Sequence, residues 1–451
     1  MLDGCTGWPE GFVDRYWAAG HWRGNTLDNL LRGWAQEYGP RTALVHGATR
    51  LSYAQLNRRV DRMAAGFRGR GLRPGMRVVV QLPNVPEFVV TVFALMRAGA
   101  VPVVLPVTEP GRVAGTVRLA QAVGYVAPAA YRGVDHTALA ADIAARWPFL
   151  RRVFTLEEPG TESPYGGLTT DPSNCQYSPL GNLDAAPYKA LALSAAEVAF
   201  LLPAGGTDEA PLLVPRTHDD YAYQARAAAE SVALTGADVY LAALPAASDL
   251  VLGCPGIAGT LSVGGTVVLT DSQDNAQLVE LIRTERVTVT AVRPATAVHW
   301  LDATAADPGA LDTLRVVQLT GGEPIEAGLA ERLAARLGGR LQQVFAPPAG
   351  PRTLTRLGDP DGRVLGTQGR PLSPDDELRL VGPDGADVPE GGSGELLARG
   401  PYVPRGYYRA PEQDARAFTP TGYLRTGRLA RRTPDGDLVL AGRVDAAADP
   451  A

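Results

Sequence analysis

Short apolar segments that alternate with helical segments limit the fold of this chain more than any other feature. Residues 77–82 and 101–105 have the pattern of buried strands, and an apolar helix beginning at Pro86 separates them. A second series of the same kind runs through residues 199–319. Such alternation is typical of βαβ units in a mainly parallel sheet. We therefore expect an α/β fold with two parallel-sheet subdomains.

The pattern of predicted secondary structure changes near residue 351. Short strand-like runs are separated there by Asp-Gly and Gly-Gly turns, which predicts a small β-barrel or sandwich. A stretch rich in Gly, Pro and Ser at residues 158–190 indicates a boundary. A chain of 451 residues is also too long for one compact core. The predicted subdomains are 1–190, 191–350 and 351–445.

Composition excludes several classes of protein. The formal net charge of -5 argues against a nucleic-acid or anionic-membrane partner, and no apolar run is long enough to span a membrane. The first residues do not form a basic leader before an apolar stretch. Cys5, Cys175 and Cys254 are too few and too widely spaced for a disulfide framework or a zinc site. We expect a cytoplasmic protein with reduced thiols.

Several short sequence words between residue 8 and about residue 445 carry a resemblance to a known family. They are Trp8-Pro9-Glu10, Gln81-Leu82-Pro83-Asn84, Pro215-Arg216-Thr217-His218-Asp219-Asp220-Tyr221, Leu341-Gln342-Gln343-Val344-Phe345, Thr367-Gln368-Gly369-Arg370-Pro371 and Arg405-Gly406-Tyr407-Tyr408-Arg409. With these words the chain resembles the adenylate-forming superfamily of acyl-CoA synthetases and adenylation domains. Within it, the chain looks most like the 2,3-dihydroxybenzoate and salicylate AMP ligases.

The resemblance implies both a fold and a reaction. Members of this superfamily join a carboxylic acid to ATP, release pyrophosphate and leave an acyl-AMP. They then pass the acyl group to a thiol on a carrier protein or coenzyme A. A large N-terminal part binds the substrates, and a small C-terminal lid supplies a Lys. The chain ends soon after the hinge residue Arg443, so we expect the lid domain to be absent.

The phosphate loop departs from the family pattern Ser-Gly-Gly-Thr-Thr-Gly-x-Pro-Lys. The matching positions here are Ala204, Gly205, Gly206, Thr207, Asp208, Glu209 and, at the Lys, Leu212. Asp208 and Glu209 add two carboxylates where a polyanion would bind, and Leu212 removes the cation. Like charges a few ångströms apart cost on the order of 1–4 kcal/mol. The loop is therefore expected to bind phosphates poorly.

Two other nucleotide positions also differ from the family. Ala349 stands where the family has a Glu that helps to hold Mg²⁺, and a methyl group is no ligand for a hard cation. Arg428 replaces the Asp that accepts hydrogen bonds from the ribose, although Arg has donors only. Of the family's nucleotide residues, Arg443 is kept.

The acid pocket is altered as well. Ser248, Asp249 and Cys254 replace a His, an Asn and a Ser of the aryl-acid pattern, and Gly321 and Gly322 are assigned to the same pocket. Asp249 is compatible with a ligand that carries an amine, such as an aminobenzoate or an amino acid. It is equally compatible with a helix cap or a residue that faces water.

Two further residues are candidates for catalysis, besides Asp249. Cys254 could act as a nucleophile, and His218 could act as an acid or a base. A small buried Cys and a His with a structural role at a helix start are the alternatives. The other His residues lack metal-ligand spacing, so no metal site is expected.

These changes led to a main functional prediction with two alternatives. The main prediction is a protein that does not make acyl-AMP and needs neither ATP nor Mg²⁺. It would keep a pocket for an aryl or amino acid, or for a carrier-bound acyl group, in natural-product biosynthesis. The first alternative is an active aryl-acid AMP ligase that uses ATP and Mg²⁺. The second is a non-catalytic partner subunit of a synthetase complex.

Overall fold

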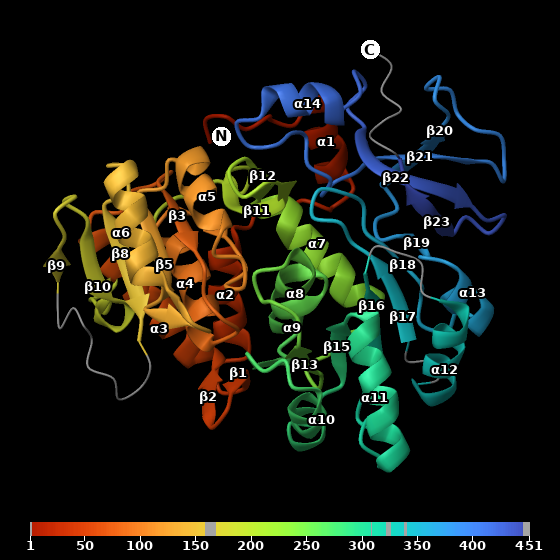
Figure 1. Cartoon of the computed structure of the whole chain (residues 1–451), viewed down its shortest axis with the longest axis horizontal. Helices are drawn as coiled ribbons and strands as arrows, with labels where there is room; N and C mark the ends of the chain where they lie inside the picture. Colours follow the sequence, from red (N-terminus) through yellow and green to blue (C-terminus); the bar gives the residue numbers. More distant parts are fainter. Residues whose placement is uncertain (1, 158–167, 308, 322–325, 338–340, 445–451) are drawn as a thin grey trace.

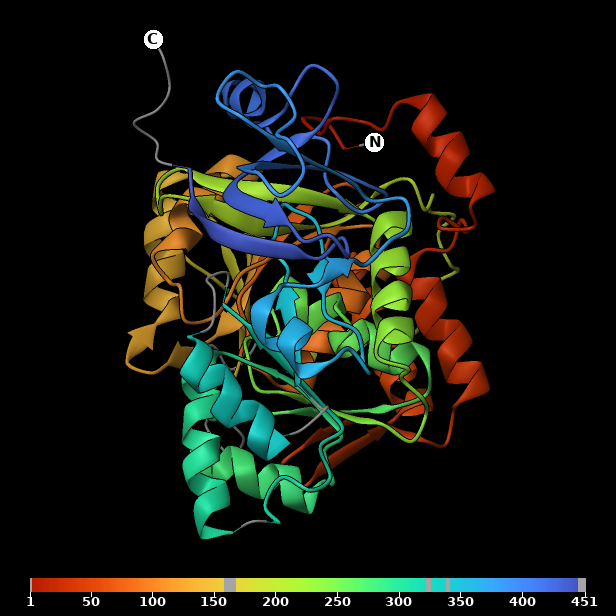
Figure 2. The ribbon, with the colours of Figure 1, turned by 90° about the vertical axis from the view of Figure 1, so that its right-hand side faces the viewer.

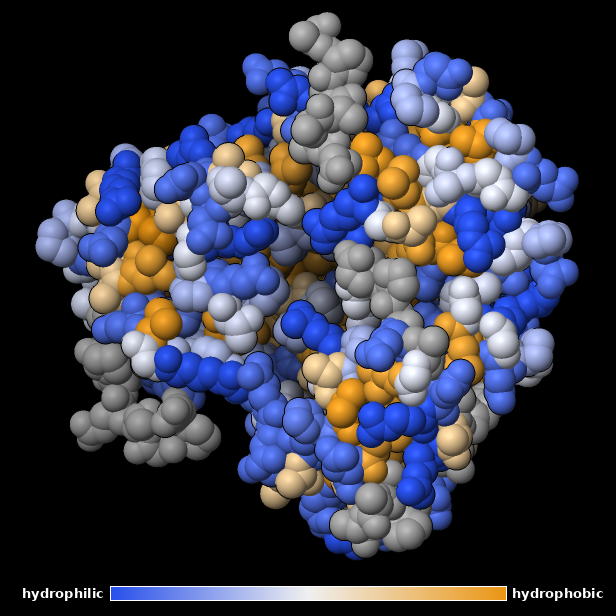
Figure 3. All heavy atoms as spheres, turned by 45° about the vertical axis from the view of Figure 1, so that its right-hand side comes forward, coloured by the Kyte–Doolittle hydropathy of each residue, from blue (hydrophilic) through white to orange (hydrophobic). Residues whose placement is uncertain are grey.

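The computed structural model describes residues 2–157, 168–307, 309–321, 326–337 and 341–444. Two large sheets with helices against them form most of the molecule, and a smaller antiparallel sheet lies at one end (Figure 1). Figure 3 shows that one face of the surface is hollowed near its middle, with polar and apolar side chains mixed around the hollow. Among the described residues, no helix has both the length and the apolar character needed to cross a membrane.

The first sheet has eight strands in the order β12-β11-β4-β3-β5-β8-β10-β9. Its strands are β3 (Arg77–Val80), β4 (Val101–Val104), β5 (Gly124–Pro128), β8 (Arg152–Leu156), β9 (Thr169–Thr170), β10 (Gln176–Pro179), β11 (Val198–Gly206) and β12 (Pro211–Thr217). The central strands β4, β3, β5, β8 and β10 pair in parallel. The parallel sheet expected from the first apolar series is therefore confirmed.

The helices of this half are α2 (Leu27–Glu37), α3 (Tyr53–Gly69), α4 (Pro86–Arg97), α5 (Arg112–Ala120) and α6 (His136–Arg146). Nearly every residue of α4 is buried, because the helix is apolar on all sides and packs in the interior. A short hairpin of β6 (Ala130–Tyr131) and β7 (Val134–Asp135) and the 3-10 turn η1 (Leu180–Asn182) complete this half.

The second sheet has nine strands in the order β19-β18-β17-β16-β15-β13-β14-β1-β2. Its strands are β1 (Thr42–His46), β2 (Thr49–Ser52), β13 (Val239–Ala242), β14 (Thr266–Leu269), β15 (Val289–Val292), β16 (Val316–Thr320), β17 (Leu341–Phe345), β18 (Thr353–Leu354) and β19 (Arg370–Pro371). The strands from β1 to β17 in this order pair in parallel, which confirms the second α/β series.

The helices of the second half are α7 (His218–Ser231), α8 (Asp249–Gly253), α9 (Gly256–Ser262), α10 (Asn275–Thr284), α11 (Pro294–Ala306), α12 (Ala327–Leu337) and α13 (Asp361–Gly366). Asn84, just before α4, ties the two halves together. Its side-chain amide donates to the carbonyls of Ala242 (3.0 Å) and Leu244 (2.9 Å), and its oxygen accepts from the N–H of Ala246 (2.7 Å). All polar groups of this buried side chain are thereby satisfied.

Beyond residue 371, four antiparallel strands form a separate sheet in the order β20-β21-β22-β23. They are β20 (Glu377–Val381), β21 (Ser393–Arg399), β22 (Leu424–Arg432) and β23 (Leu438–Arg443), and α14 (Pro411–Ala417) lies between β21 and β22 in the chain. The helix α1 (Glu10–Ala18) lies at the same end of the molecule (Figures 1 and 2). There Arg15 forms ion pairs with Asp375 and Glu377.

Sheet membership does not follow the expected boundary at residue 190. The first sheet extends past that point to Thr217, and β1 and β2 at residues 42–52 belong to the second sheet. Two sheets thus each draw strands from both sides of the boundary. The division at 190, 350 and 445 remains a prediction.

Candidate functional site

The centre of the candidate site is Asp249, the first residue of α8. Ser248 caps this helix: its hydroxyl donates to the carbonyl of Pro245 (2.7 Å) and accepts from the N–H of Val251 (3.4 Å). The Asp249 side chain is buried, with 3% of its surface exposed. Asp249 is therefore neither the helix cap nor a residue that faces water. Both of the structural roles that its sequence position allowed are excluded.

Three donors surround the Asp249 carboxylate. Arg216, at the end of β12, approaches one oxygen to 3.4 Å, and Arg352, in the segment before β18, donates to the same oxygen. Gln224 of α7 donates to the other oxygen at 3.1 Å. These three side chains come from segments far apart in the sequence. An amine on a bound ligand would have to displace them to reach Asp249.

The charges of this network balance. Arg216 also forms an ion pair with Asp220 at 2.8 Å, so two guanidinium groups face two carboxylates in the interior. Burial opposes the charge of Arg216, but the neighbouring Asp220 and Asp249 raise its pKa above the ordinary value. Arg352 is anchored further by donating to the carbonyl of Gly350 at 2.7 Å. The network needs no ligand to neutralise it.

The structure does not favour a catalytic role for Cys254 or for His218. The Cys254 thiol is fully buried, and burial raises its pKa to about 12. It is protonated near neutral pH, and a thiol is a much weaker nucleophile than a thiolate. The His218 Nδ1 accepts a hydrogen bond from the N–H of Leu27 (3.1 Å), and burial lowers the pKa of His218 to about 4. His218 therefore fixes the start of α2.

The altered phosphate loop is a β-hairpin. Ala204, Gly205 and Gly206 end β11, and Leu212 lies in β12. Gly205 and Gly206 have φ of +127° and +75°, and a Cβ on Gly206 would meet the carbonyl of Ala210 at 2.3 Å. The tight turn therefore requires glycine at 206.

A cation reaches this hairpin from α5. Arg112 donates to the carbonyls of Gly205 (3.2 Å) and Gly206 (3.3 Å). Its Nε also lies 3.6 Å from the Asp208 carboxylate and 3.1 Å from that of Glu109. A positive charge thus lies beside the hairpin, on a residue 94 positions before Gly206, although Leu212 itself carries none.

Thr207 and Glu209, the other two residues of the loop, also form hydrogen bonds that hold the hairpin. Thr207 closes the turn, because its hydroxyl accepts from the N–H of Ala210 at 3.0 Å. The carbonyl of Glu209 accepts from Arg118 of α5 at 2.6 Å. The α5 helix lies so close that a Cβ on Gly115 would meet the carbonyl of Asp208 at 2.1 Å. Arginines of α5 thus support the hairpin along its tip.

The residues at the expected magnesium position do not fit a metal ion. Ala349 is buried in an apolar cluster that includes Cys254. No group of three or more His, Cys, Asp or Glu residues that could hold a metal occurs in the described part of the chain. Arg428 and Arg443 lie opposite each other on β22 and β23. Gly321 follows β16 at the surface, and Gly322 lies outside the described residues.

Removal of the Asp249 charge tests the buried network. The substitution Asp249→Asn leaves Arg216 and Arg352 without their shared carboxylate. Breaking a buried ion pair typically costs about 3 kcal/mol or more, so the free energy of unfolding in urea should fall by at least that amount. The control is Asp387→Asn, which removes an exposed ion pair with Arg379. Equal free energies of unfolding for the two variants would contradict a stabilising role of the ion pairs around Asp249.

The buried His218 predicts a pH dependence of stability. Its pKa is about 4 in the folded protein and about 6.5 when unfolded, so the unfolded chain binds more protons between these values. Stability contributed by His218 is present above pH 6.5 and falls by about 2 kcal/mol on going from pH 7.5 to pH 5. The variant His218→Gln should lack this component in urea titrations at both pH values.

The matched control for that measurement is His299→Gln, because His299 lies exposed on α11. This variant should keep the pH dependence of the unchanged protein. If His218→Gln also keeps it, the buried neutral imidazole does not contribute as described.

Comparison with known proteins gives the relatives of this fold and site. The model of the family "AMP-binding enzyme" matches residues 31–408. The 2,3-dihydroxybenzoate-AMP ligase of Bacillus subtilis is 40% identical over 98% of this chain and 79% of its own length. The salicyl-AMP ligase / salicyl-S-ArCP synthetase of Mycobacterium tuberculosis is 39% identical over 98% of this chain and 77% of its own length. The apo structure of MbtA from Mycobacterium smegmatis superposes with a TM-score of 0.89 at 38% identity, over 98% of this chain and 80% of that one.

These relatives overturn the main functional prediction. Proteins about 40% identical to almost the whole chain are named as aryl-acid ligases, which favours the first alternative over a protein unable to make acyl-AMP. The physical weakness of that prediction lies at the loop. At the loop it counted the charges of residues 204–212 alone, whereas the fold adds Arg112 together with Glu109 beside it. The sequence resemblance itself is confirmed: the chain belongs to the family of AMP-binding, adenylate-forming enzymes.

Proposed function

We propose that this chain is an aryl-acid AMP ligase whose substrate is an aryl carboxylic acid with hydroxyl substituents. The observation that carries the proposal is the extent of the likeness. Relatives named for 2,3-dihydroxybenzoate and for salicylate match 98% of this chain at 40% and 39% identity. A carrier-protein thiol is the acceptor that we infer for the second step.

The reaction is an exchange of bonds at phosphorus. A carboxylate oxygen of the aryl acid attacks the α-phosphorus of ATP and forms the acyl-phosphate bond. The bond between the α-phosphorus and the bridging oxygen breaks, and pyrophosphate leaves with its electron pair. Because the position of Ala349 does not fit a metal ion, we assign no step to magnesium there.

The buried network favours substrates without an ammonium group. Asp249 already receives hydrogen bonds from Arg352, Gln224 and Arg216, and its charge is balanced. An ammonium group would need an unpaired carboxylate to offset the loss of its hydration. A phenolic hydroxyl carries no charge and needs no such partner. The network therefore separates hydroxybenzoates from free amino acids, but it does not separate them from aminobenzoates, whose amine is uncharged.

Arg112 supports phosphate binding at the hairpin. Its side chain is 22% exposed, so a ligand can reach it, whereas the Asp208 carboxylate beside it is 64% exposed and can turn toward solvent. An arginine offers several N–H donors to phosphate oxygens. We infer that Arg112 supplies the positive charge that the family otherwise places at the position of Leu212.

The substrate proposal is tested by pyrophosphate exchange with the full chain. Salicylate and 2,3-dihydroxybenzoate should support exchange, and free amino acids should support it at least about tenfold less well. The reason is the cost of bringing an ammonium group to a carboxylate that is already paired. Exchange that is strongest with a free amino acid, or absent with every aryl acid, would refute the proposal.

The role of Arg112 is tested by the substitution Arg112→Gln. Loss of the guanidinium should weaken the binding of ATP, measured by calorimetry, by about tenfold, because a charged hydrogen bond to phosphate is lost. The matched control is Arg146→Gln, which removes an exposed arginine at the end of α6. Equal affinities of the two variants would show that Arg112 does not contact the phosphates.

A further inference from the structure

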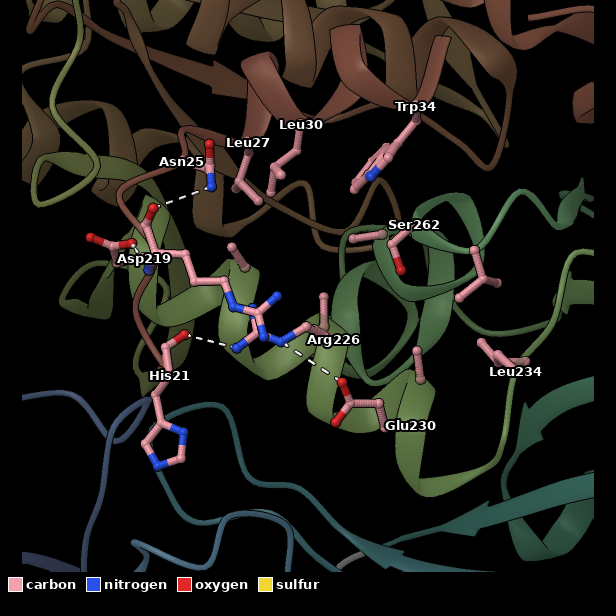
Figure 4. Close-up of a pocket in the computed structure, with 16 residues that line it drawn as sticks. His21, Asn25, Leu27, Leu30, Trp34, Asp219, Arg226, Glu230, Leu234 and Ser262 are labelled. Atoms are coloured by element: carbon pink, nitrogen blue, oxygen red, sulfur yellow. Dashed lines mark hydrogen bonds and ion pairs between the residues drawn. The ribbon is translucent and has the colours of Figure 1, made fainter. Parts of the chain in front are cut away.

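A cavity lies on the other side of α7 from Asp249. It has a volume of about 310 Å³ and opens between α2, α7 and α9 (Figure 4). Leu27, Leu30 and Trp34 of α2 form one wall. In Figure 4 these side chains point from α2 toward α7. A cavity of this size is at the lower end of the range found for small-molecule sites.

The cavity exists because the opposite wall is made of small side chains. Ala222, Ala225 and Ala229 of α7 and Ala258 of α9 face the larger side chains of α2. An alanine ends at its Cβ, so the helix surfaces do not meet at this level. An empty apolar cavity forgoes dispersion contacts with its lining. A ligand with an apolar body would restore them.

Arg226 lies on the rim of the cavity and is weakly paired. Asp219 also lines the cavity, but its carboxylate accepts hydrogen bonds from the backbone N–H groups of Arg23 (3.1 Å) and Gly24 (2.9 Å). Arg226 of α7 donates to the neutral backbone carbonyls of Gly20 (3.1 Å) and His21 (3.0 Å). Its ion pair with Glu230 is long, 3.9 Å, and the Glu230 side chain is 71% exposed, so this partner contributes little. Burial, with the nearby Arg23 in addition, lowers the pKa of Arg226. An anion bound beside Arg226 would pair with its charge and would oppose the lowering of its pKa.

This cavity is separate from the candidate site. Asp220 and Gln224 lie on the face of α7 that contacts Arg216. Ala222, Ala225 and Arg226 lie on the face that lines the cavity. The two sets alternate along one helix because side chains three or four positions apart share a face. A ligand in the cavity would therefore contact the back of the helix that positions Gln224.

We propose that this cavity is a second ligand site, which binds a small amphipathic carboxylate. The apolar body of the ligand packs between Trp34 and the alanines of α7, and its carboxylate pairs with Arg226. A guanidinium matches a carboxylate with two parallel hydrogen bonds, which an amide or alcohol cannot do. The site does not depend on the aryl-acid ligase reaction.

The probe is 4-bromophenylacetate, soaked into crystals of the full chain, because the anomalous signal of bromine reports its location. Bromine should appear between Trp34 and Ala225, with the carboxylate at Arg226. The neutral 4-bromophenylacetamide should bind at least about tenfold more weakly in calorimetry. Bromine found solely elsewhere in the molecule, or equal binding of the acid and the amide, overturns the proposal.

Two variants separate this cavity from the site at Asp249. Ala222→Phe places a ring in the cavity from a partly exposed position, and it should abolish the bromine peak there. Arg226→Gln should weaken calorimetric binding of the acid by about tenfold. The control Arg283→Gln removes an exposed arginine of α10 and should bind as the unchanged protein does. A bromine peak that persists in Ala222→Phe, or unchanged affinity in Arg226→Gln, contradicts the assignment.

Discussion

The buried ion pairs around Asp249 are the interaction on which the arrangement of this site depends. They join β12 through Arg216, α8 through Asp249 and the segment before β18 through Arg352. Single charges are costly in the interior, and each of these groups is tolerable because the others are present. The network therefore fixes the relative positions of three segments that are distant in the sequence.

A site whose charges are balanced internally selects ligands by shape and by neutral polar groups. Under the proposed function, Asp249 would therefore not select a substrate that carries an ammonium group. The phosphate hairpin follows the same principle. Asp208 places a carboxylate beside the glycines, and Arg112 of α5 lies between it and the carboxylate of Glu109. In both places the partner charge comes from another segment of the fold. The net charge around the site therefore differs from the net charge of the sequence motif alone.

The sequence predicted the fold better than it predicted the site. Apolar strands such as residues 77–82 and 101–105 are local signals, and both lie in the parallel sheet as expected. Contacts made by Arg112 and Arg352 are not local. The sequence separations in these pairs are 94 residues, for Arg112 with Gly206, and 103 residues, for Arg352 with Asp249. No spacing rule relates such residues.

The position of β1 and β2 shows the same limit. These strands precede the first sheet in the chain, yet β1 pairs with β14 of the second. Hydrophobic patterning alone does not choose the neighbours of a strand in a sheet. Roles assigned to Cys254 and His218 also depended on burial, which decides the pKa of each and cannot be inferred from residue type alone.

The most direct test is a double-mutant cycle between Asp249 and Arg352. Urea unfolding of the Asp249→Asn, Arg352→Gln and doubly substituted proteins gives the coupling free energy of the pair. If the two charges neutralise each other in the interior, the double variant should be more stable than the sum of the single effects by about 2 kcal/mol or more. Purely additive effects would contradict a charge-balanced network at the centre of the site.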